Sequence, residues 1–210
     1  GYLEMGDSLY HNAYVGERLF FLATGPSLKD SPLEKLQGEH TFGVSGLCAW
    51  TGLPFEPTFY GLGEAMQWKR WENMVPGGSI KIGALEGRPS KSGWFIVDRR
   101  LSMPLALGHW GPHGEEYFWT AGANSAVYEI ALQAAFWLGF SQVYLLGEDQ
   151  RGTGHVYEGG NQHSLVHAST IELAAQTCLR EYGKGGRALF NCTPNSALQS
   201  IPYKSLESVL

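Results

Sequence analysis

The sequence predicts an α/β fold with a Rossmann-like, mostly parallel central sheet and helices on both faces. The main observation is that short, continuously apolar segments alternate with longer segments of helical periodicity. A continuous apolar run is typical of a strand that is buried on both faces, as parallel sheets require. The chain has 210 residues, of which 43% are hydrophobic, and it shows no internal repeat or linker. We therefore expect residues 1–210 to form one domain.

The first half of the chain is expected to contribute five strands. Residues 1–16 have no clean period and are interpreted as an arm or cap, which could contact another copy in a homo-oligomer. Strands are expected at 18–24, 40–46, 57–63, 79–85 and 93–98. A helix over 31–38 is indicated by Ser31 before Pro32 at its start and by Gly38 at its end. A second helix is expected over 64–74.

The second half is expected to complete the sheet. Residues 99–119 are irregular, and a loop of this length is usually functional. Apolar residues at helical spacing then predict the strongest helix, which begins near 123 and ends at Gly139. The remaining elements are expected to be a strand at 142–149, a glycine-rich, lid-like loop at 150–166, a helix at 168–183, a strand at 187–194 and a short closing helix at 203–210.

Composition argues against several classes of partner. The net charge is −5 and there is no run of Lys or Arg, whereas a nucleic-acid partner would require a basic face. No apolar stretch approaches the roughly 18 residues that would span a membrane. The three cysteines, Cys48, Cys178 and Cys192, have no metal-type spacing and read as reduced thiols of a cytoplasmic protein.

The first candidate site is the turn that follows the first strand, Gly25-Pro26-Ser27, preceded by Thr24. Carboxyl ends of parallel strands gather at one edge of a sheet, and ligands bind at that edge. Backbone amides and a small hydroxyl can hold a phosphate or a sugar hydroxyl there. An ordinary strand-to-helix turn would explain the same tripeptide.

A second cluster opens the strongest predicted helix, and it consists of small residues. These are Gly122, Ala123, Asn124 and Ser125. Small side chains let a ligand approach, and the free amides and dipole of a helix start favour an anion. The alternative is a simple N-cap made by Asn124 or Ser125.

The densest group of chemically active side chains lies between 147 and 167. The acids are Glu148, Asp149 and Glu158, the histidines are His155, His163 and His167, and Tyr157 lies among glycines. A base, a hydroxyl and a glycine-rich loop are the components of an active site that closes over its substrate. A solvated loop is the alternative. The pair His163-x-x-x-His167 lacks the glutamate of a zinc-type motif, so no metal site is expected.

Polar residues also follow the last predicted strand. Asn191, Thr193, Asn195 and Ser196 offer amides and hydroxyls suited to a base or a ribose. They could instead form only Asx and Ser/Thr turns.

Together these motifs resemble the superfamily that joins the bacterial family 42 sialyltransferases, the flagellin-modifying motility accessory factors and the MptE-like 6-hydroxymethylpterin diphosphokinases. Four stretches carry the resemblance, in the expected order: "ATGPSLK", "TAGANSAVYEIALQAAFWLGFSQVYLLGEDQ", "HASTIELAAQTCLREY" and "NCTPNSAL". The second is the most specific. The resemblance extends from about residue 18 to the C-terminus.

The resemblance implies a transferase that binds a nucleotide at the carboxyl ends of its strands. In the sialyltransferase branch the donor is CMP-sialic acid, the acceptor is a hydroxyl, and no cofactor is tightly bound. The donor would lie against the Gly-Pro-Ser turn and the helix start at 122–125. Tyr157 matches a lid tyrosine that steadies the leaving phosphate. His167 best matches the general base, with His163 as the second choice.

Departures from the family pattern leave two other functions open. The family usually has Asn or another polar residue before Gly-Pro-Ser, and here Thr24 stands there. Ser45 is the only side chain in "GVSG" able to form a hydrogen bond. An MptE-like pyrophosphokinase would use ATP with magnesium, but only Glu64 stands where that branch favours an aspartate-rich segment. A non-catalytic nucleotide or sugar binder is the third possibility.

Overall fold

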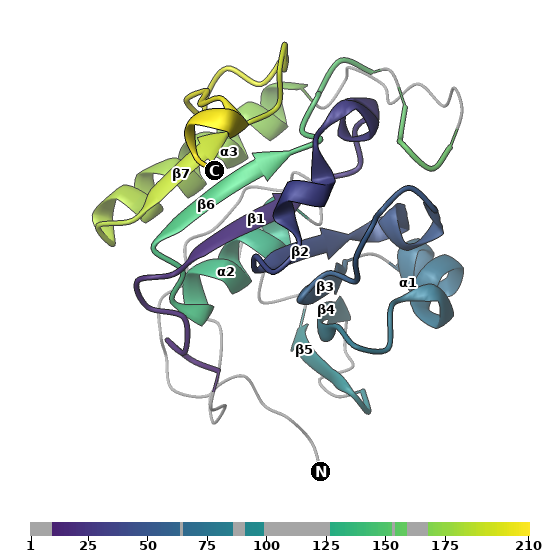
Figure 1. Cartoon of the computed structure of the whole chain (residues 1–210). Helices are drawn as coiled ribbons and strands as arrows, with labels where there is room; N and C mark the ends of the chain where they lie inside the picture. The colour runs from purple at the N-terminus through teal and green to yellow at the C-terminus, as the bar shows by residue number, and fades with distance from the viewer. Residues whose placement is uncertain (1–9, 64, 86–90, 99–126, 153, 159–167) are drawn as a thin grey trace.

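A seven-stranded sheet forms the centre of the molecule, and each of its strand pairings is parallel (Figure 1). The computed structural model describes residues 10–63, 65–85, 91–98, 127–152, 154–158 and 168–210. The strands are β1 (Arg18–Leu22), β2 (Thr41–Val44), β3 (Phe59–Leu62), β4 (Ile80–Leu85), β5 (Trp94–Asp98), β6 (Gln142–Leu146) and β7 (Ala188–Asn191). The predicted fold class is therefore confirmed, and each strand lies within the segment expected from the sequence.

The strand order fixes where a ligand can bind. The sheet runs β5-β4-β3-β2-β1-β6-β7, so the chain builds outward from β1 to one edge and then returns to place β6 on the other side of β1. This reversal makes the carboxyl ends of β1 and β6 the topological switch point, where open parallel sheets form their ligand crevice. Leu22 at the end of β1 is in register with Leu146 at the end of β6.

One face of the sheet is covered by the longest helices. These are α2 (Leu132–Leu138), which continues a π-helical turn at Val127–Ala131, and α3 (Ala168–Lys184). Their apolar side chains bury Phe21, Phe42 and Phe59 of the sheet completely. The hydroxyl of Tyr182 donates to the carbonyl of Leu132 over 2.7 Å and joins α3 to α2.

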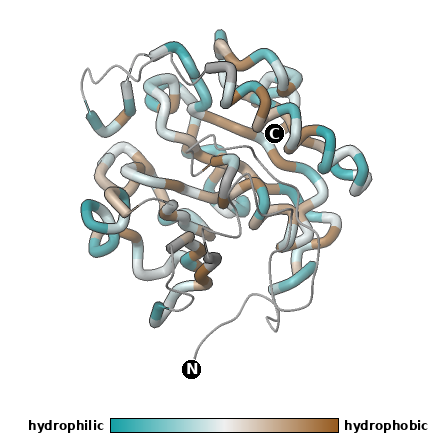
Figure 2. The backbone as a smooth tube through the Cα atoms, turned by 180° about the vertical axis from the view of Figure 1, so that it is seen from behind, coloured by the Kyte–Doolittle hydropathy of each residue, from teal (hydrophilic) through white to brown (hydrophobic). Residues whose placement is uncertain are grey.

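The opposite face is covered by shorter elements. The helix α1 (Ala65–Trp71) lies there together with 3-10 turns at Pro26–Asp30, Leu33–Leu36, Ser45–Ala49, Glu72–Met74 and Leu206–Ser208. Side chains of alternate strand residues, such as Phe20 and Leu22, pack against Leu28 and Leu36 from these turns. Figure 2 shows the hydrophobic segments gathered along the strands and the helices that cover them.

Two predicted helices are wrong in type. The segments 31–38 and 203–210 each form only one 3-10 turn, Leu33–Leu36 and Leu206–Ser208. Each segment is too short to offset the cost of nucleating an α-helix. In the first, the buried residues Leu33 and Leu36 are three apart, which is the repeat of a 3-10 helix. The predicted helix at 64–74 likewise ends in a 3-10 turn after Trp71.

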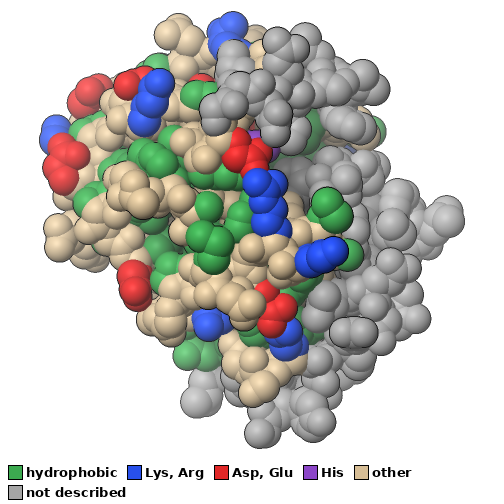
Figure 3. All heavy atoms as spheres, turned by 90° about the vertical axis from the view of Figure 1, so that its right-hand side faces the viewer, with side chains coloured by type: hydrophobic (Ala, Val, Ile, Leu, Met, Phe, Trp, Pro, Cys, Tyr) green, Lys and Arg blue, Asp and Glu red, His purple; other side chains and the backbone are tan. Residues whose placement is uncertain are grey.

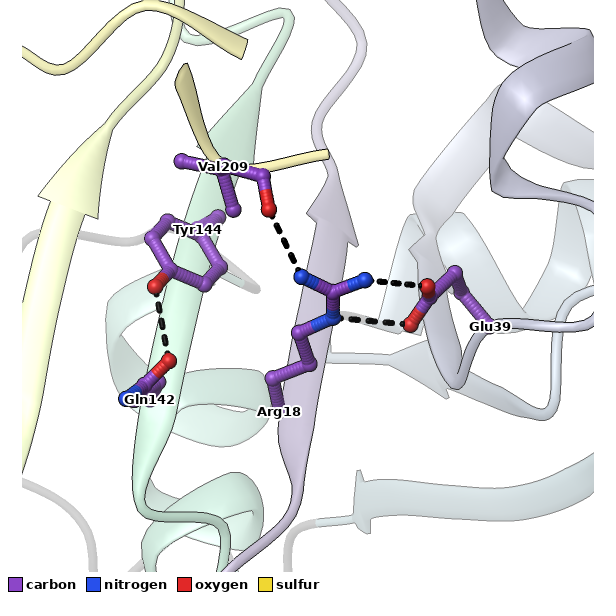
Figure 4. Close-up of polar contacts among 5 residues, drawn as sticks. All are labelled: Arg18, Glu39, Gln142, Tyr144 and Val209. Atoms are coloured by element: carbon purple, nitrogen blue, oxygen red, sulfur yellow. Dashed lines mark hydrogen bonds and ion pairs between the residues drawn. The ribbon is translucent and has the colours of Figure 1, made fainter. Parts of the chain in front are cut away.

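The amino end of β1 is joined to two other parts of the chain by Arg18 (Figure 4). Its Nε and Nη2 atoms donate to the Glu39 carboxylate over 3.1 and 2.5 Å, and its Nη1 donates to the carbonyl of Val209 over 2.7 Å. These contacts lie at the amino ends of the strands, away from the switch point; the bidentate contact holds Glu39, and the bond to Val209 O ties the C-terminal segment to the sheet. In the described part of the chain, no helix has the length and apolarity that crossing a membrane requires.

Candidate functional site

The segments that follow β1 and β6 lie against each other at the switch point. The amide of Ala23 donates to Leu146 O over 2.8 Å, and the amide of Gly25 donates to Gly147 O over 2.7 Å. The β6 loop then folds back, and Val156 N donates to Thr24 O over 2.7 Å. Residues 23–27 and the described residues 147–152 and 154–158, which are far apart in sequence, therefore form one structure at this end of the sheet.

A carboxylate occupies the turn after β1. Ser27 donates to Asp149 Oδ2 from its hydroxyl over 2.8 Å and from its amide over 3.4 Å. Gly25 has no room for a side chain, since a Cβ would lie 1.8 Å from Asp149 Oδ2 and 2.3 Å from Gly147 O. The amide and the hydroxyl of Ser27 thus already donate to a carboxylate of the protein. The negative charge of this carboxylate makes the turn better suited to a ligand hydroxyl than to a phosphate.

Beside it lies a buried acid, Glu148, whose side chain is 2% exposed. Its Oε1 accepts from Gln150 Nε2 over 2.5 Å and from the Tyr128 hydroxyl over 3.2 Å. Burial raises the pKa of Glu148 to about 7, although these two hydrogen bonds favour the charged form. The site therefore contains a carboxyl that titrates near neutral pH and is linked to the π-helical turn through Tyr128.

The segment after β7 forms hydrogen bonds with the loop that follows β6. Thr193 Oγ1 accepts from Glu148 N over 3.0 Å, and Ser196 Oγ donates to Glu148 O over 2.5 Å. The amide of Ala197 donates to Asp149 O over 2.8 Å, and Arg151 Nε donates to Asn195 O. Thr193 and Asn195 thus lie beside the predicted site, and their visible contacts hold the loop in place.

Three aromatic side chains, those of His155, Tyr157 and Trp71, contact one another beside the turn after β1. Thr24 Oγ1 lies 2.7 Å from His155 Nδ1, and the His155 ring stacks on Tyr157 with centroids 4.9 Å apart. Tyr157 meets Trp71 edge to face at 5.3 Å. Burial raises the pKa of the Tyr157 hydroxyl, so it keeps its proton and can donate a hydrogen bond.

The ring of Tyr157 packs against the 3-10 turn Ser45–Ala49, which follows β2. Gly46 has no room for a side chain, because a Cβ would lie 2.3 Å from the Tyr157 ring. Ser45 has a left-handed backbone with φ of 52°, and its carbonyl accepts from the buried Tyr60 hydroxyl over 2.7 Å. The same hydroxyl accepts from Cys48 N over 2.7 Å, so Tyr60 fixes the turn that carries Ser45.

An ion pair connects the β6 loop to α1. Glu158 pairs with Arg70, whose guanidinium also lies 4.9 Å from the centroid of the Trp71 ring.

Basic, acidic and apolar side chains are interspersed on the face of the molecule seen in Figure 3. The described residues contain no group of three His, Cys, Asp or Glu side chains that could hold a metal ion.

Several predicted site residues lie outside the described part of the chain. They are Gly122, Ala123, Asn124, Ser125, His163 and His167, and their roles stay predictions. Sequence reasoning named His155 among the histidines of this stretch but gave it no specific role, although it stands two residues before Tyr157. Residues 155–158 form a turn in which Glu158 N donates to His155 O over 3.2 Å, so the stacking of the two rings arises within this turn and not from strand alternation.

The comparisons with known proteins concern the fold. No protein-family model and no curated protein sequence matches the chain. Solved structures of the sialyltransferase CstII from Campylobacter jejuni are similar. Its complex with cytidine-5'-monophosphate gives a TM-score of 0.50 at 13% identity, covering 90% of this chain and 85% of that chain. Its complex with CMP-3FNeuAc gives 0.56 at 12% identity, covering 89% and 85%. At this identity the likeness shows a shared fold.

Proposed function

We propose that the chain is a glycosyltransferase-like enzyme that uses a nucleotide-activated sugar of the CMP-sugar type as its donor. The observation that carries the proposal is the fold, which matches over 90% of the chain a sialyltransferase solved with cytidine-5'-monophosphate. The groups gathered at the carboxyl ends of β1 and β6 support it, because nucleotides bind parallel sheets at this point. The donor is treated as a substrate, and no tightly bound cofactor is required.

The donor nucleoside would lie along the turn after β1. Ser27 and Asp149 present a hydroxyl and a carboxylate joined over 2.8 Å, a pair suited to the hydroxyls of a ribose. Gly25 and Pro26 would let the donor nucleoside come close enough to contact the backbone of this turn. We expect Ser45 and the polar groups near Thr193 and Asn195 to complete this surface. The helix start predicted from the sequence at 122–125 would add a site suited to an anion.

The transfer itself needs a base for the acceptor and a donor of hydrogen bonds for the leaving phosphate. His167, or His163 in its place, would take the proton from the acceptor hydroxyl. Tyr157 would donate to the phosphate as negative charge develops on it. The fixed position of Tyr157 between His155 and Trp71 lets it act without further rearrangement of its ring.

A ligand screen followed by a transfer assay tests the proposal. Thermal unfolding is measured with CMP, CMP-sialic acid, GDP-sugars, ATP with magnesium, and pterins, because a ligand at 100 times its Kd stabilises the protein by about 2.7 kcal/mol. We expect stabilisation by the cytidine compounds and release of CMP with a hydroxyl acceptor. Stabilisation by ATP with magnesium and a pterin would favour a pyrophosphokinase, whereas CMP-sugar binding without transfer would indicate a binder.

The proposed base is tested on the same assay. His167→Ala is expected to lower turnover by roughly 100- to 10,000-fold with little change in donor affinity. His163→Ala serves as the matched variant. Full turnover in both variants would contradict a histidine base in this loop.

A further inference from the structure

Glu148 is a buried acid at the carboxyl end of β6, and the proposed function gives it no role. Its side chain is 2% exposed, and it directly precedes Asp149, which accepts from the hydroxyl and the amide of Ser27. Its main chain is held on both sides, because its amide donates to Thr193 Oγ1 over 3.0 Å and its carbonyl accepts from Ser196 Oγ over 2.5 Å. Glu148 therefore has a fixed position next to the pair that we expect to bind the donor nucleoside.

The polar partners of the Glu148 side chain all contact one of its two oxygens. Oε1 accepts from Gln150 Nε2 over 2.5 Å and from the Tyr128 hydroxyl over 3.2 Å. Tyr128 is fully buried in the π-helical turn Val127–Ala131, and its carbonyl accepts from Gln133 Nε2 over 3.2 Å. A proton can be added at Oε2 without displacing either donor.

Near neutral pH the Glu148 carboxyl is divided between its neutral and its charged form. Burial and, to a smaller extent, the charge of Asp149 raise its pKa to about 7, although the bonds from Gln150 and Tyr128 favour the charged form. A further negative charge near this group would raise its pKa again, because buried charges are little screened by water or salt. The phosphate of a nucleotide donor would bring such a charge to this end of the sheet.

The titratable groups that act on this acid or on its partner Tyr128 add no positive charge. Burial raises the pKa of Tyr128 well above its ordinary value, so its hydroxyl stays neutral. The groups of α3 that act on Tyr128 are Cys178 and Glu172. Lys29, in the turn after β1, and Arg151, in the loop after β6, are exposed, so water screens their charges.

We propose that Glu148 takes up a proton from solvent when the anionic nucleotide donor binds, and that its neutral form keeps Asp149 in place on Ser27. The inference rests on the proposed function, because it requires a ligand that carries a phosphate to this end of the sheet. No bond of the donor breaks in this step. Glu148 is thus a positioning residue, and it makes the affinity for the donor fall as the pH rises through neutrality.

Calorimetric titration at pH 7 in two buffers of different ionisation enthalpy tests the inference, because the difference in heat gives the number of protons taken up. The ligand is CMP-3FNeuAc, whose phosphate is a diester and does not titrate near neutral pH. If the bound phosphate strengthens proton binding about tenfold, the wild-type chain takes up about 0.4 proton per ligand and binds it about 5-fold more weakly at pH 8 than at pH 6. Cytidine, the neutral control, should take up less than about 0.1 proton.

Variants assign the proton to Glu148. Glu148→Gln keeps an oxygen for both donors but does not titrate, so it should bind CMP-3FNeuAc without proton uptake and with equal affinity at pH 6 and pH 8. Tyr128→Phe removes a bond that favours the charged form, so it should move the fall in affinity to higher pH, and it keeps the test decisive if the glutamine variant unfolds. The exposed Glu56→Gln is the matched control and should behave as the wild type.

Two results would overturn the inference alone. One is binding of CMP-3FNeuAc to the wild-type chain with no proton uptake, and the other is equal uptake by the wild type and Glu148→Gln. An unshifted pH profile in Tyr128→Phe would also count against it. Failure of the wild-type chain to bind CMP-3FNeuAc would overturn the proposed function and this inference with it.

Discussion

Replacing the buried acid Glu148 with Gln should make the protein more stable at neutral and alkaline pH. The folded chain holds the Glu148 proton more tightly than the unfolded chain, because burial raises its pKa from 4.5 to about 7. As the pH rises from 4.5 the unfolded state ionises first, so the free energy of unfolding falls until about pH 7 and is then constant. At about 1.4 kcal/mol per pKa unit, the wild-type chain loses about 3 kcal/mol over this window.

The glutamine variant lacks this titration but keeps an oxygen that can accept from Tyr128 and Gln150. We expect Glu148→Gln to exceed the wild-type free energy of unfolding by up to about 3 kcal/mol at pH 8, and by less than about 1 kcal/mol at pH 5. Urea unfolding followed by tryptophan fluorescence at both pH values measures the difference. The exposed Glu56→Gln is the matched control and should change little at either pH. The reasoning is refuted if the Glu148→Gln effect is equal at pH 5 and pH 8, or larger at pH 5.

Three other substitutions test the supports of the site and of the sheet. Tyr60→Phe should lower the free energy of unfolding by about 2 kcal/mol, because Cys48 N and Ser45 O lose their shared partner, while the exposed Tyr203→Phe should not; equal effects in urea unfolding would contradict this. Gly46→Ala should cost about 1–3 kcal/mol and weaken CMP binding by displacing Tyr157, whereas Gly77→Ala, with open space at its Cβ, should do neither. Arg18→Met should cost about 1 kcal/mol, since its side chain is 35% exposed, and 1 M NaCl should shrink that loss; a loss insensitive to salt would argue against an ionic contribution.

The fold could be predicted from the sequence because its signal is local. The run "LFFLA" within the first strand segment is continuously apolar, which is typical of a strand covered on both faces, and that pattern is visible in one short window. The type of each short helix was harder to predict from the sequence. Whether "SPLEKLQG" forms a 3-10 turn or an α-helix depends on which leucines the sheet buries, and a short apolar pattern does not reveal this.

The site was predictable at the level of segments but not of contacts. Parallel strands bring their carboxyl ends together, so the turn at Gly25 and the loop after Leu146 could be expected at one edge. The pairing of Ser27 with Asp149 joins residues 122 positions apart, and the contact of Thr24 with His155 joins residues 131 apart. Such contacts depend on the path of the loop after β6, including the left-handed conformations of Gly147 and Gln150, which no local motif encodes.

The central claim is that a CMP-sugar donor binds at the carboxyl ends of β1 and β6, and the most direct measurement is a crystal structure of the chain with CMP-3FNeuAc. The account predicts ligand density at this edge, with a ribose hydroxyl within hydrogen-bond distance of Ser27 or Asp149 and the phosphate beside Tyr157. Density at another edge of the sheet would contradict it. So would an empty switch point in crystals grown at a ligand concentration that saturates the chain in solution.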